Sequence, residues 1–283
     1  MSVELLRNGI GESNLERGSF HLEFLFSEIL DIEDWPFNYF DCLANVLLHL
    51  AARISDVELT RLLLSKGARV TSVDLKDQSA LHIACSRKSL EIIKLLTEIS
   101  PAYMLEETDD EDRRPLEIAC SHNCPEAVQF LLTRGCSVHV QDFPEDFREG
   151  SLLCAIRNIP DYAVPIASMV LDAGADIHLT DDIGTTLLMF VVFRSAFDEI
   201  NSGSEKYSYA DLFTLFIERG CDVNATRLGS TVLHLAVIEK QEILVRKNAC
   251  SFLELKSTGV MSMVLPHCSM HVEEVARDLW IYL

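Results

Sequence analysis

Apolar residues recur along this chain in short phrases with the spacing of one face of a helix. In most copies a leucine stands three residues before an alanine, and this spacing predicts a helix that packs on one side. The phrases begin at Leu48, Leu81, Leu116, Leu152, Leu187 and Leu233. The steps between them are 33, 35, 36, 35 and 46 residues. A regular period of this size indicates a repeat protein.

A second apolar segment follows the phrase in each unit, and in most copies it ends at a glycine. Its four clearest copies are residues 62–68, 130–136, 169–175 and 216–221. Glycine supplies the left-handed residue that often ends a helix. The sequence therefore predicts a pair of helices in each unit. Because one pair cannot bury its apolar face alone, neighbouring pairs are expected to stack.

The residues just before the phrase suit the start of a helix. Ser79, Thr185 and Thr231 stand two residues before the leucine, where a hydroxyl oxygen can accept a backbone N–H. Pro115 occupies the first turn of its helix, where its missing donor has no cost. The first helix of each unit is thus expected to begin at these positions.

The phrase, its period and the glycine-ended second helix resemble the ankyrin-repeat family over roughly residues 45–247. The resemblance implies an all-α solenoid of about six stacked helix pairs joined by β-finger turns. Its units begin near residues 46, 79, 114, 150, 185 and 231. It also implies that His49, His82 and His234 are structural hydrogen-bonding residues rather than ligands or bases.

The flanking segments and two of the units depart from the pattern. We expect residues 1–44 to form an acidic, aromatic cap or a degenerate repeat. Residues 248–283 are expected to form a C-terminal cap with a short amphipathic helix. The second helix of the fourth unit should start near Pro165, because proline suits a first turn. The polar stretch at residues 201–206 is predicted to be a loop, either a neutral insertion or part of a binding face.

Charge bears on the partners that this chain can bind. The formal net charge is −20, and residues 1–44 hold nine acidic residues against Arg7 and Arg17. Such a field disfavours direct nucleic-acid binding and favours a partner with a basic surface. An alternative is that the acidic residues only solvate an elongated protein.

The sequence also bears on the compartment. We find no apolar run long enough to span a bilayer, and no secretory signal. Nine scattered cysteines without a C-x-x-C pair favour a reducing compartment, the cytoplasm or the nucleus. We expect an intracellular monomer that does not bind membranes.

Residue clusters that could carry chemistry are few. The chain has no P-loop, G-x-S-x-G or H-E-x-x-H motif. Ser121, His122 and Cys124 lie together in a predicted turn, without a group that would orient a base. His267, Cys268 and His271 in the tail lack a fourth metal ligand. We therefore predict no enzymatic activity, no catalytic residues, no metal and no cofactor.

The resemblance implies a non-catalytic scaffold or adaptor that binds another protein through the concave face of the array. Residues of the finger turns are the candidate partner-binding residues. They are Val73, Asp74, Lys76, Asp77, Asp110, Glu111, Asp112, Arg113, Asp142, Phe143, Asp146, Phe147, Asp181 and Asp182. Phe143 and Phe147 are the most specific candidates, because exposed aromatic residues are good interface anchors. Alternatively, these two rings fold back onto the adjacent finger.

Two further functions remain open at this point. The tail carries Leu265-Pro266 and ends in Trp280-Ile281-Tyr282-Leu283, which resembles parts of an F-box at a longer spacing. This favours a substrate-receptor subunit of a ubiquitin ligase. An acidic ankyrin array also resembles the inhibitors of Rel-type transcription factors, which hold a basic partner.

Overall fold

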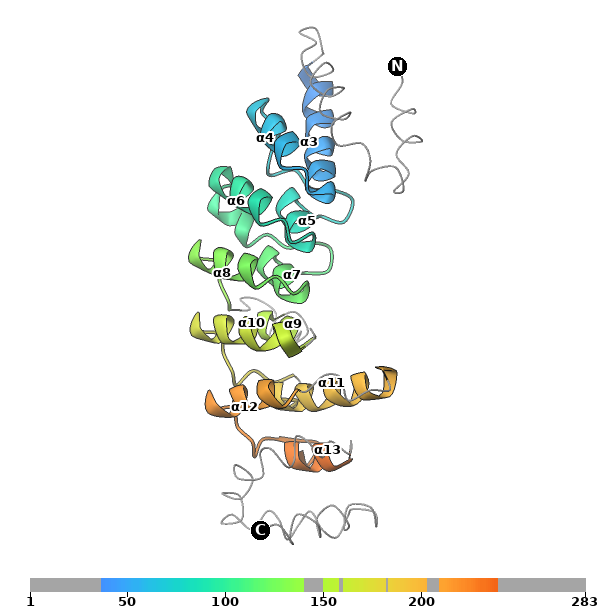
Figure 1. The fold of residues 1–283 in the computed structure, drawn as a ribbon, viewed down its shortest axis with the longest axis vertical. Coiled ribbons are helices and arrows are strands. Elements are labelled where there is room, and N and C mark those ends of the chain that lie inside the picture. Colours follow the sequence, from blue (N-terminus) through green and yellow to red (C-terminus); the bar gives the residue numbers. More distant parts are fainter. Residues whose placement is uncertain (1–36, 140–149, 158–159, 182, 203–208, 239–283) are drawn as a thin grey trace. The chain divides into compact units, whose positions relative to one another are not determined.

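A computed structural model describes residues 37–139, 150–157, 160–181, 183–202 and 209–238 of the chain. The described elements are helices, joined by turns and one short hairpin (Figure 1). The chain divides into two compact units, Met1–Leu131 and Leu132–Leu283. No helix within the described ranges is long and apolar enough to cross a membrane.

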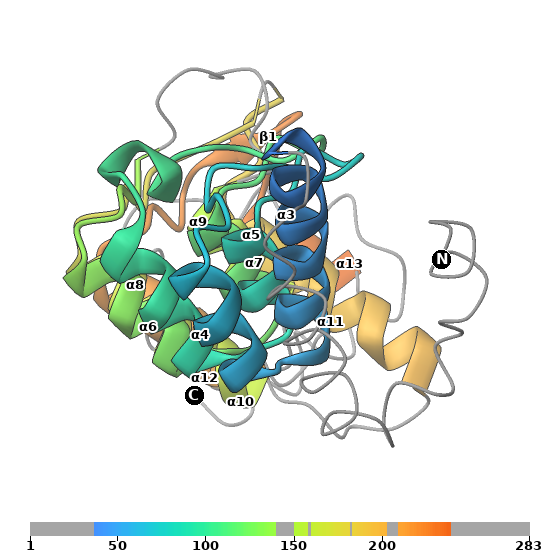
Figure 2. The same cartoon turned by 90° about the horizontal axis from the view of Figure 1, so that it is seen from above.

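Unit 1 contains three helix pairs. They are α3 (Phe37–Ile54) with α4 (Val57–Ser65), α5 (Ala80–Ser86) with α6 (Leu90–Ile99), and α7 (Pro115–Ser121) with α8 (Pro125–Thr133). A 3₁₀ helix, η2 (Ala102–Leu105), follows α6. Helix α5 packs between α3 and α7, and α4 packs on α6. Seen from above, these first helices and second helices form separate layers (Figure 2).

Unit 2 continues the same plan. It contains α9 (Ser151–Ile156) with α10 (Pro160–Asp172), and α11 (Leu187–Ser202) with α12 (Ala210–Glu218). An antiparallel hairpin of β1 (Thr226–Arg227) and β2 (Ser230–Thr231) leads into α13 (Val232–Ile238). Helix α11 packs against α9 and α13, and α10 packs on α12. The predicted all-α stack of helix pairs is confirmed, with five pairs and the first helix of a sixth described.

The repeated leucine and alanine of the phrase form the core. Leu48, Leu81 and Leu116 are buried, and so are the alanines three residues after them. A small residue at the alanine position lets neighbouring helices approach closely. Burying each leucine contributes about 1.5–3 kcal/mol relative to leaving it exposed. In unit 2 the fully buried Phe213 and Phe216 of α12 add larger side chains to this core.

The histidine of the phrase closes the first turn of its helix. Ser79 Oγ accepts the N–H of His82, and His82 Nδ1 accepts the N–H of Ser79 at 3.1 Å. Thr231 and His234 repeat this arrangement, with 3.2 Å from the Thr231 N to His234 Nδ1. The structural role predicted for His82 and His234 is thereby confirmed. His49 differs, because it lies inside α3, but its Nε2 is 3.1 Å from the Gln78 carbonyl oxygen, so its role is also structural.

The capping residue of α11 differs from the prediction. The N–H of Met189 donates to Thr186 Oγ1 at 3.4 Å, so Thr186, and not Thr185, stands at the start of the helix. The preceding finger turn, built on Asp181, bonds the N–H of Thr185 instead. The unit is therefore shifted by one residue, and Leu188 takes the place of the phrase leucine.

Two other local predictions were wrong. Helix α10 begins at Pro160 and holds Pro165 in its interior. The donor missing at Pro165 would serve the carbonyl of Asp161, an exposed residue of the first turn, where water can replace it. Helix α11 extends to Ser202, so the stretch predicted as a loop from Asn201 begins as helix.

The predicted ends of the array fall only partly on described residues. Helix α3 begins at Phe37, earlier than the predicted array start at residue 45. The remainder of the N-terminal segment lies outside the described residues. So do the rest of the predicted loop, the C-terminal helix, the F-box-like segment, and the trio of His267, Cys268 and His271.

Candidate functional site

The finger turns of unit 1 are shaped by one aspartate each. Asp74 Oδ1 accepts the N–H groups of Lys76 at 2.8 Å and Gln78 at 3.1 Å. Asp109 Oδ1 accepts the N–H groups of Glu111 and Arg113, both at 3.0 Å. Because each carboxylate holds two N–H groups, the two turns have the same shape. This internal role of the aspartates was not predicted from the sequence.

The two fingers are also bonded to each other. The N–H of Asp110 donates to the Lys76 carbonyl oxygen at 3.0 Å. Gln78 Nε2 donates to Asp109 Oδ2 at 3.2 Å. His82 Nε2 lies 3.0 Å from the Glu107 carbonyl oxygen, so the imidazole ties helix α5 to the second finger. Side chains at the finger tips are therefore presented from a fixed backbone.

Asp109 is the most heavily bonded residue of this ladder. Its side chain is buried, and Arg113 donates to Oδ2 from Nε at 3.2 Å and from Nη2 at 2.8 Å. Burial alone would raise the pKa of the Asp109 carboxyl. The hydrogen bonds from Arg113 and Gln78 outweigh burial and hold the pKa below its usual value. Asp109 is therefore ionised at neutral pH and stabilises the finger.

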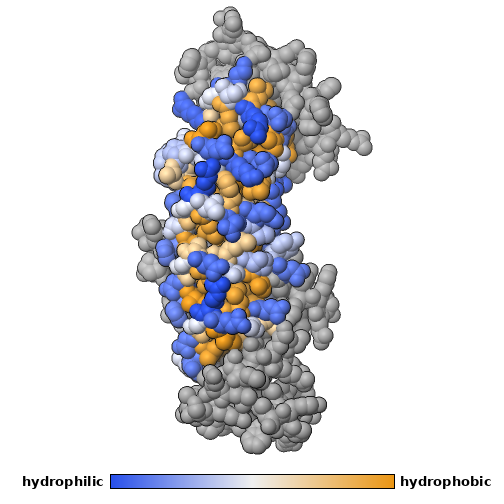
Figure 3. All heavy atoms as spheres, turned by 60° about the vertical axis from the view of Figure 1, so that its left-hand side comes forward, coloured by the Kyte–Doolittle hydropathy of each residue, from blue (hydrophilic) through white to orange (hydrophobic). Residues whose placement is uncertain are grey.

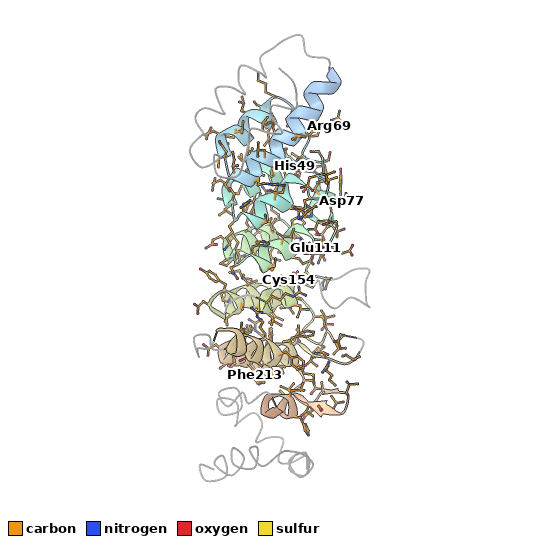
Figure 4. All side chains as sticks on the ribbon, turned by 90° about the vertical axis from the view of Figure 1, so that its right-hand side faces the viewer. His49, Arg69, Asp77, Glu111, Cys154 and Phe213 are labelled. Carbon is orange, nitrogen blue, oxygen red and sulfur yellow. The ribbon has the colours of Figure 1, made fainter. Side chains whose placement is uncertain are left out.

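Most of the predicted contact residues of unit 1 are exposed. We call Val73, Leu75, Lys76, Asp77, Asp110, Glu111 and Asp112 the acidic finger surface. Asp77 and Glu111 project from the same edge of the unit (Figure 4). Asp74 and Arg113 are only half-buried and are engaged internally, Asp74 with Arg53 at 3.5 Å and Arg113 with Asp109. The exposed members can be reached from solvent, although Glu111 also pairs with Arg113 at 3.0 Å.

Leu75 is the member of this surface that the sequence analysis missed. Its side chain is fully exposed, and that of Val73 is 52% exposed. The sequence signal that could have identified it is an aliphatic residue between the polar Asp74 and Lys76 at the tip of a turn. Exposed apolar side chains on a fixed backbone are effective contacts for a partner because they lose little entropy on binding.

The fingers of unit 2 carry different side chains. Asp181 Oδ1 accepts the N–H groups of Ile183 at 3.1 Å and Thr185 at 2.6 Å, as Asp74 and Asp109 do in unit 1. The tips, however, are the aliphatic Ile183 and Leu228, both exposed. The remaining predicted contact residues, Asp142, Phe143, Asp146, Phe147 and Asp182, lie outside the described residues.

The outer face of the helix pairs offers no comparable segregation of side chains. Hydrophilic and hydrophobic residues are intermixed over the face in Figure 3. Scattered apolar residues are ordinary on a protein surface. We therefore take the fingers, rather than this face, as the candidate site.

The side chains considered as nucleophiles or metal ligands do not form a reactive site within the described ranges. Cys124 is buried, and burial raises the pKa of its thiol, so the nucleophilic thiolate is disfavoured at neutral pH. Burial likewise raises the pKa of Cys221 to about 11. Six cysteines are buried thiols that form no disulfide: Cys85, Cys120, Cys124, Cys136, Cys154 and Cys221. Within the described ranges, no group of three or more His, Cys, Asp or Glu side chains could hold a metal ion.

Comparison with known proteins agrees with this architecture. The family model of ankyrin repeats (3 copies) matches residues 48–142. A Rickettsia bellii protein named for its ankyrin repeats is 41% identical over 73 residues, 24% of this chain and 8% of its own length. Both matches are to ankyrin repeats.

Three longer matches come from proteins of different kinds. The transient receptor potential cation channel subfamily A member 1 of Drosophila melanogaster is 26% identical over 75% of this chain. The B-cell lymphoma 3 protein homolog of Mus musculus is 28% identical over 50% of it. The E3 ubiquitin-protein ligase KEG of Arabidopsis thaliana is 30% identical over 67% of it. The chain spans only 18%, 31% and 11% of these three relatives, respectively.

Proposed function

Because this chain belongs to the ankyrin-repeat family, we propose that it is a non-catalytic scaffold that binds a partner protein through its fingers. The observation that carries this proposal is the hydrogen-bonded finger ladder of unit 1. Its backbone is fixed by Asp74 and Asp109, while the acidic finger surface faces solvent. Such a surface offers specific contacts with little loss of flexibility on binding.

We further propose that the partner has a basic surface at this site. The second finger exposes Asp110, Glu111 and Asp112 side by side, and the whole chain carries a net charge of −20. Complementary charge speeds association and excludes partners of the same sign. Leu75 supplies an apolar contact beside the acidic residues.

Charge reversal tests this proposal. Partners are captured from cells with the wild-type chain, identified by mass spectrometry, and measured individually with purified variants. Asp110→Lys, Glu111→Lys and Asp112→Lys together should weaken capture of a basic partner at least about tenfold. Reversal of the exposed Glu58, Glu91 and Glu98 on the outer helices is the matched control, because it changes net charge equally. Equal loss in both variants would contradict binding at the fingers.

A ubiquitin-ligase subunit is the second candidate. The match to the E3 ubiquitin-protein ligase KEG favours it, although the chain spans only 11% of that protein. Deletion of residues 260–283 should then abolish binding of a cullin adaptor while thermal stability is retained. Loss of stability on the same deletion would instead assign these residues to a cap.

Two finer proposals concern a Rel-type partner and the cellular compartment. Inhibition of a Rel-type transcription factor would require binding of that basic partner, which a direct binding assay measures. We also propose a reducing intracellular compartment, a proposal supported by nine scattered cysteines without a C-x-x-C pair. Fluorescence microscopy of the tagged chain distinguishes cytoplasm from nucleus.

A further inference from the structure

The hairpin of unit 2 presents a leucine in a doubly unfavourable setting. Leu228 has a left-handed backbone with φ +49°, and its side chain is 80% exposed. Residues with a Cβ avoid this region, and leucine has no polar side chain to compensate. The next residue, Gly229, already has φ +80°, as this type of turn requires. Folding alone would favour asparagine or glycine at position 228.

The neighbouring finger brings a second aliphatic tip close to this leucine. Ile183 is 41% exposed and precedes Gly184. A Cβ at Gly184 would lie only 2.9 Å from the carbonyl oxygen of Thr226, so the absent side chain lets the two fingers touch. Ile183 and Leu228 therefore stand on adjoining turns.

Arg227, the residue before Leu228, adds a positive charge to this hairpin. Its guanidinium carbon lies 5.3 Å from the centre of the Phe193 ring on α11. Its Nε is buried without a hydrogen-bond partner. A guanidinium held against a ring is fixed in orientation and suits two parallel hydrogen bonds to a carboxylate.

We propose that Ile183, Arg227 and Leu228 bind a short segment of another protein in which an aliphatic side chain adjoins a carboxylate. The aliphatic side chain packs on the two finger tips, and the carboxylate pairs with Arg227. Lysine or arginine in the segment would be repelled by Arg227. This surface therefore selects a chemistry opposite to that of the acidic finger surface, and it does not depend on that site.

The test uses the full-length chain and fluorescence anisotropy. The probe is a labelled peptide of alternating leucine and glutamate, and the comparison peptides carry glutamine or lysine in place of glutamate. The glutamate peptide should bind most tightly. Arg227→Ala should weaken its binding about tenfold or more, as expected for loss of a charge-assisted pair. Arg227→Lys, which keeps the charge but loses the paired geometry, serves if the alanine variant does not fold.

Leu228→Gly separates binding from folding. Glycine accepts the left-handed backbone, so this variant should raise the melting temperature while it weakens peptide binding about tenfold. A merely structural leucine would not give these opposite effects. Val46→Ala, at an exposed apolar residue of α3 outside both proposed surfaces, is the control and should leave the affinity for the glutamate peptide unchanged.

Two results would overturn the proposal. One is unchanged binding of the glutamate peptide in both Arg227 variants, or equal binding of the lysine peptide. The other is self-association of the wild-type chain that Arg227→Ala abolishes, without peptide binding, because it would assign the surface to a second copy. Failure of this test leaves the charge-reversal experiment on unit 1 unaffected, since the two use different residues and opposite probes.

Discussion

Three residues in the turns between paired helices have a left-handed backbone, which suits their side chains to different degrees. Ser55, Lys88 and Asn123 each follow the first helix of a unit and have φ values of +60°, +60° and +57°. Asparagine tolerates the left-handed region better than serine or lysine. The left-handed backbone therefore costs less free energy at Asn123 than at Ser55 or Lys88.

Replacing Lys88 by glycine should stabilise the chain. Lys88 is exposed, and relief of its left-handed backbone is worth about 1 kcal/mol. Urea denaturation measures the free energy of unfolding. The neighbouring Arg87 has a right-handed backbone with φ −88°, so Arg87→Gly should give no such gain. Equal effects at the two positions would show that backbone strain is not the cause.

Asp109 should make stability depend on acid pH. Its folded-state pKa is lowered, chiefly by Arg113 acting against burial, so its contribution is complete above the unfolded value of about 3.9. That contribution is lost as pH falls through the lower, folded-state pKa. Asp109→Asn should cost about 2 kcal/mol at pH 7 and flatten this part of the curve. The free energy of unfolding is measured by urea denaturation across roughly pH 2–7, the range in which carboxyl groups titrate.

At the scale of elements, the start of α7 replaces the serine and histidine of α5 with an ion pair. Glu117 is buried and accepts the N–H of Arg114 at 2.7 Å, the role that His82 has toward Ser79. The Arg114 guanidinium also bonds Glu117, and it reaches Glu106 at 3.0 Å. A buried charge of either sign is costly without its partner.

This exchange predicts strong coupling between the two residues. Glu117→Ala alone should cost about 3–5 kcal/mol, because Arg114 then lacks its buried partner. Arg114→Ser combined with Glu117→His recreates the pair that caps α5 and should be far less destabilising. Urea denaturation of Arg114→Ser, of Glu117→His and of the double variant gives the coupling energy. A double variant as unstable as the sum of its parts would contradict equivalence of the two caps.

The elements that the sequence predicted well are those whose signals are local. Leu81, Ala84 and the glycines that end second helices follow from spacing and backbone preference alone. The start of α11 was misplaced at Thr185 because threonine and leucine are each doubled in Thr185-Thr186-Leu187-Leu188, and the hydrogen bonds of Asp181 and Thr186 select the later pair. Pro165 was read as a first turn, yet Pro160 provides that turn.

The exposure of the proposed contact residues was predicted only in part, for a similar reason. The polar residues follow from their place in the fingers, but the sequence does not tell which aspartate turns inward. Asp74 and Asp109 hold the backbone, whereas Asp77 and Asp112 face solvent, and only the hydrogen bonds separate them. The exposure of Leu75 likewise depends on the turn that presents it.

At the scale of the whole molecule, the repeats determine how far the effect of a destabilising substitution extends. Within each unit, neighbouring helix pairs contact each other, and the stability of a repeat array is approximately a sum of such local terms. Phe213 of α12 is fully buried, and Phe213→Ala should cost about 3–5 kcal/mol in unit 2. Hydrogen exchange followed by mass spectrometry should then show faster exchange in α10, α11 and α12. Amides of α5 in unit 1 should keep most of their protection, whereas equal loss in both units would mean that the chain unfolds as one cooperative body.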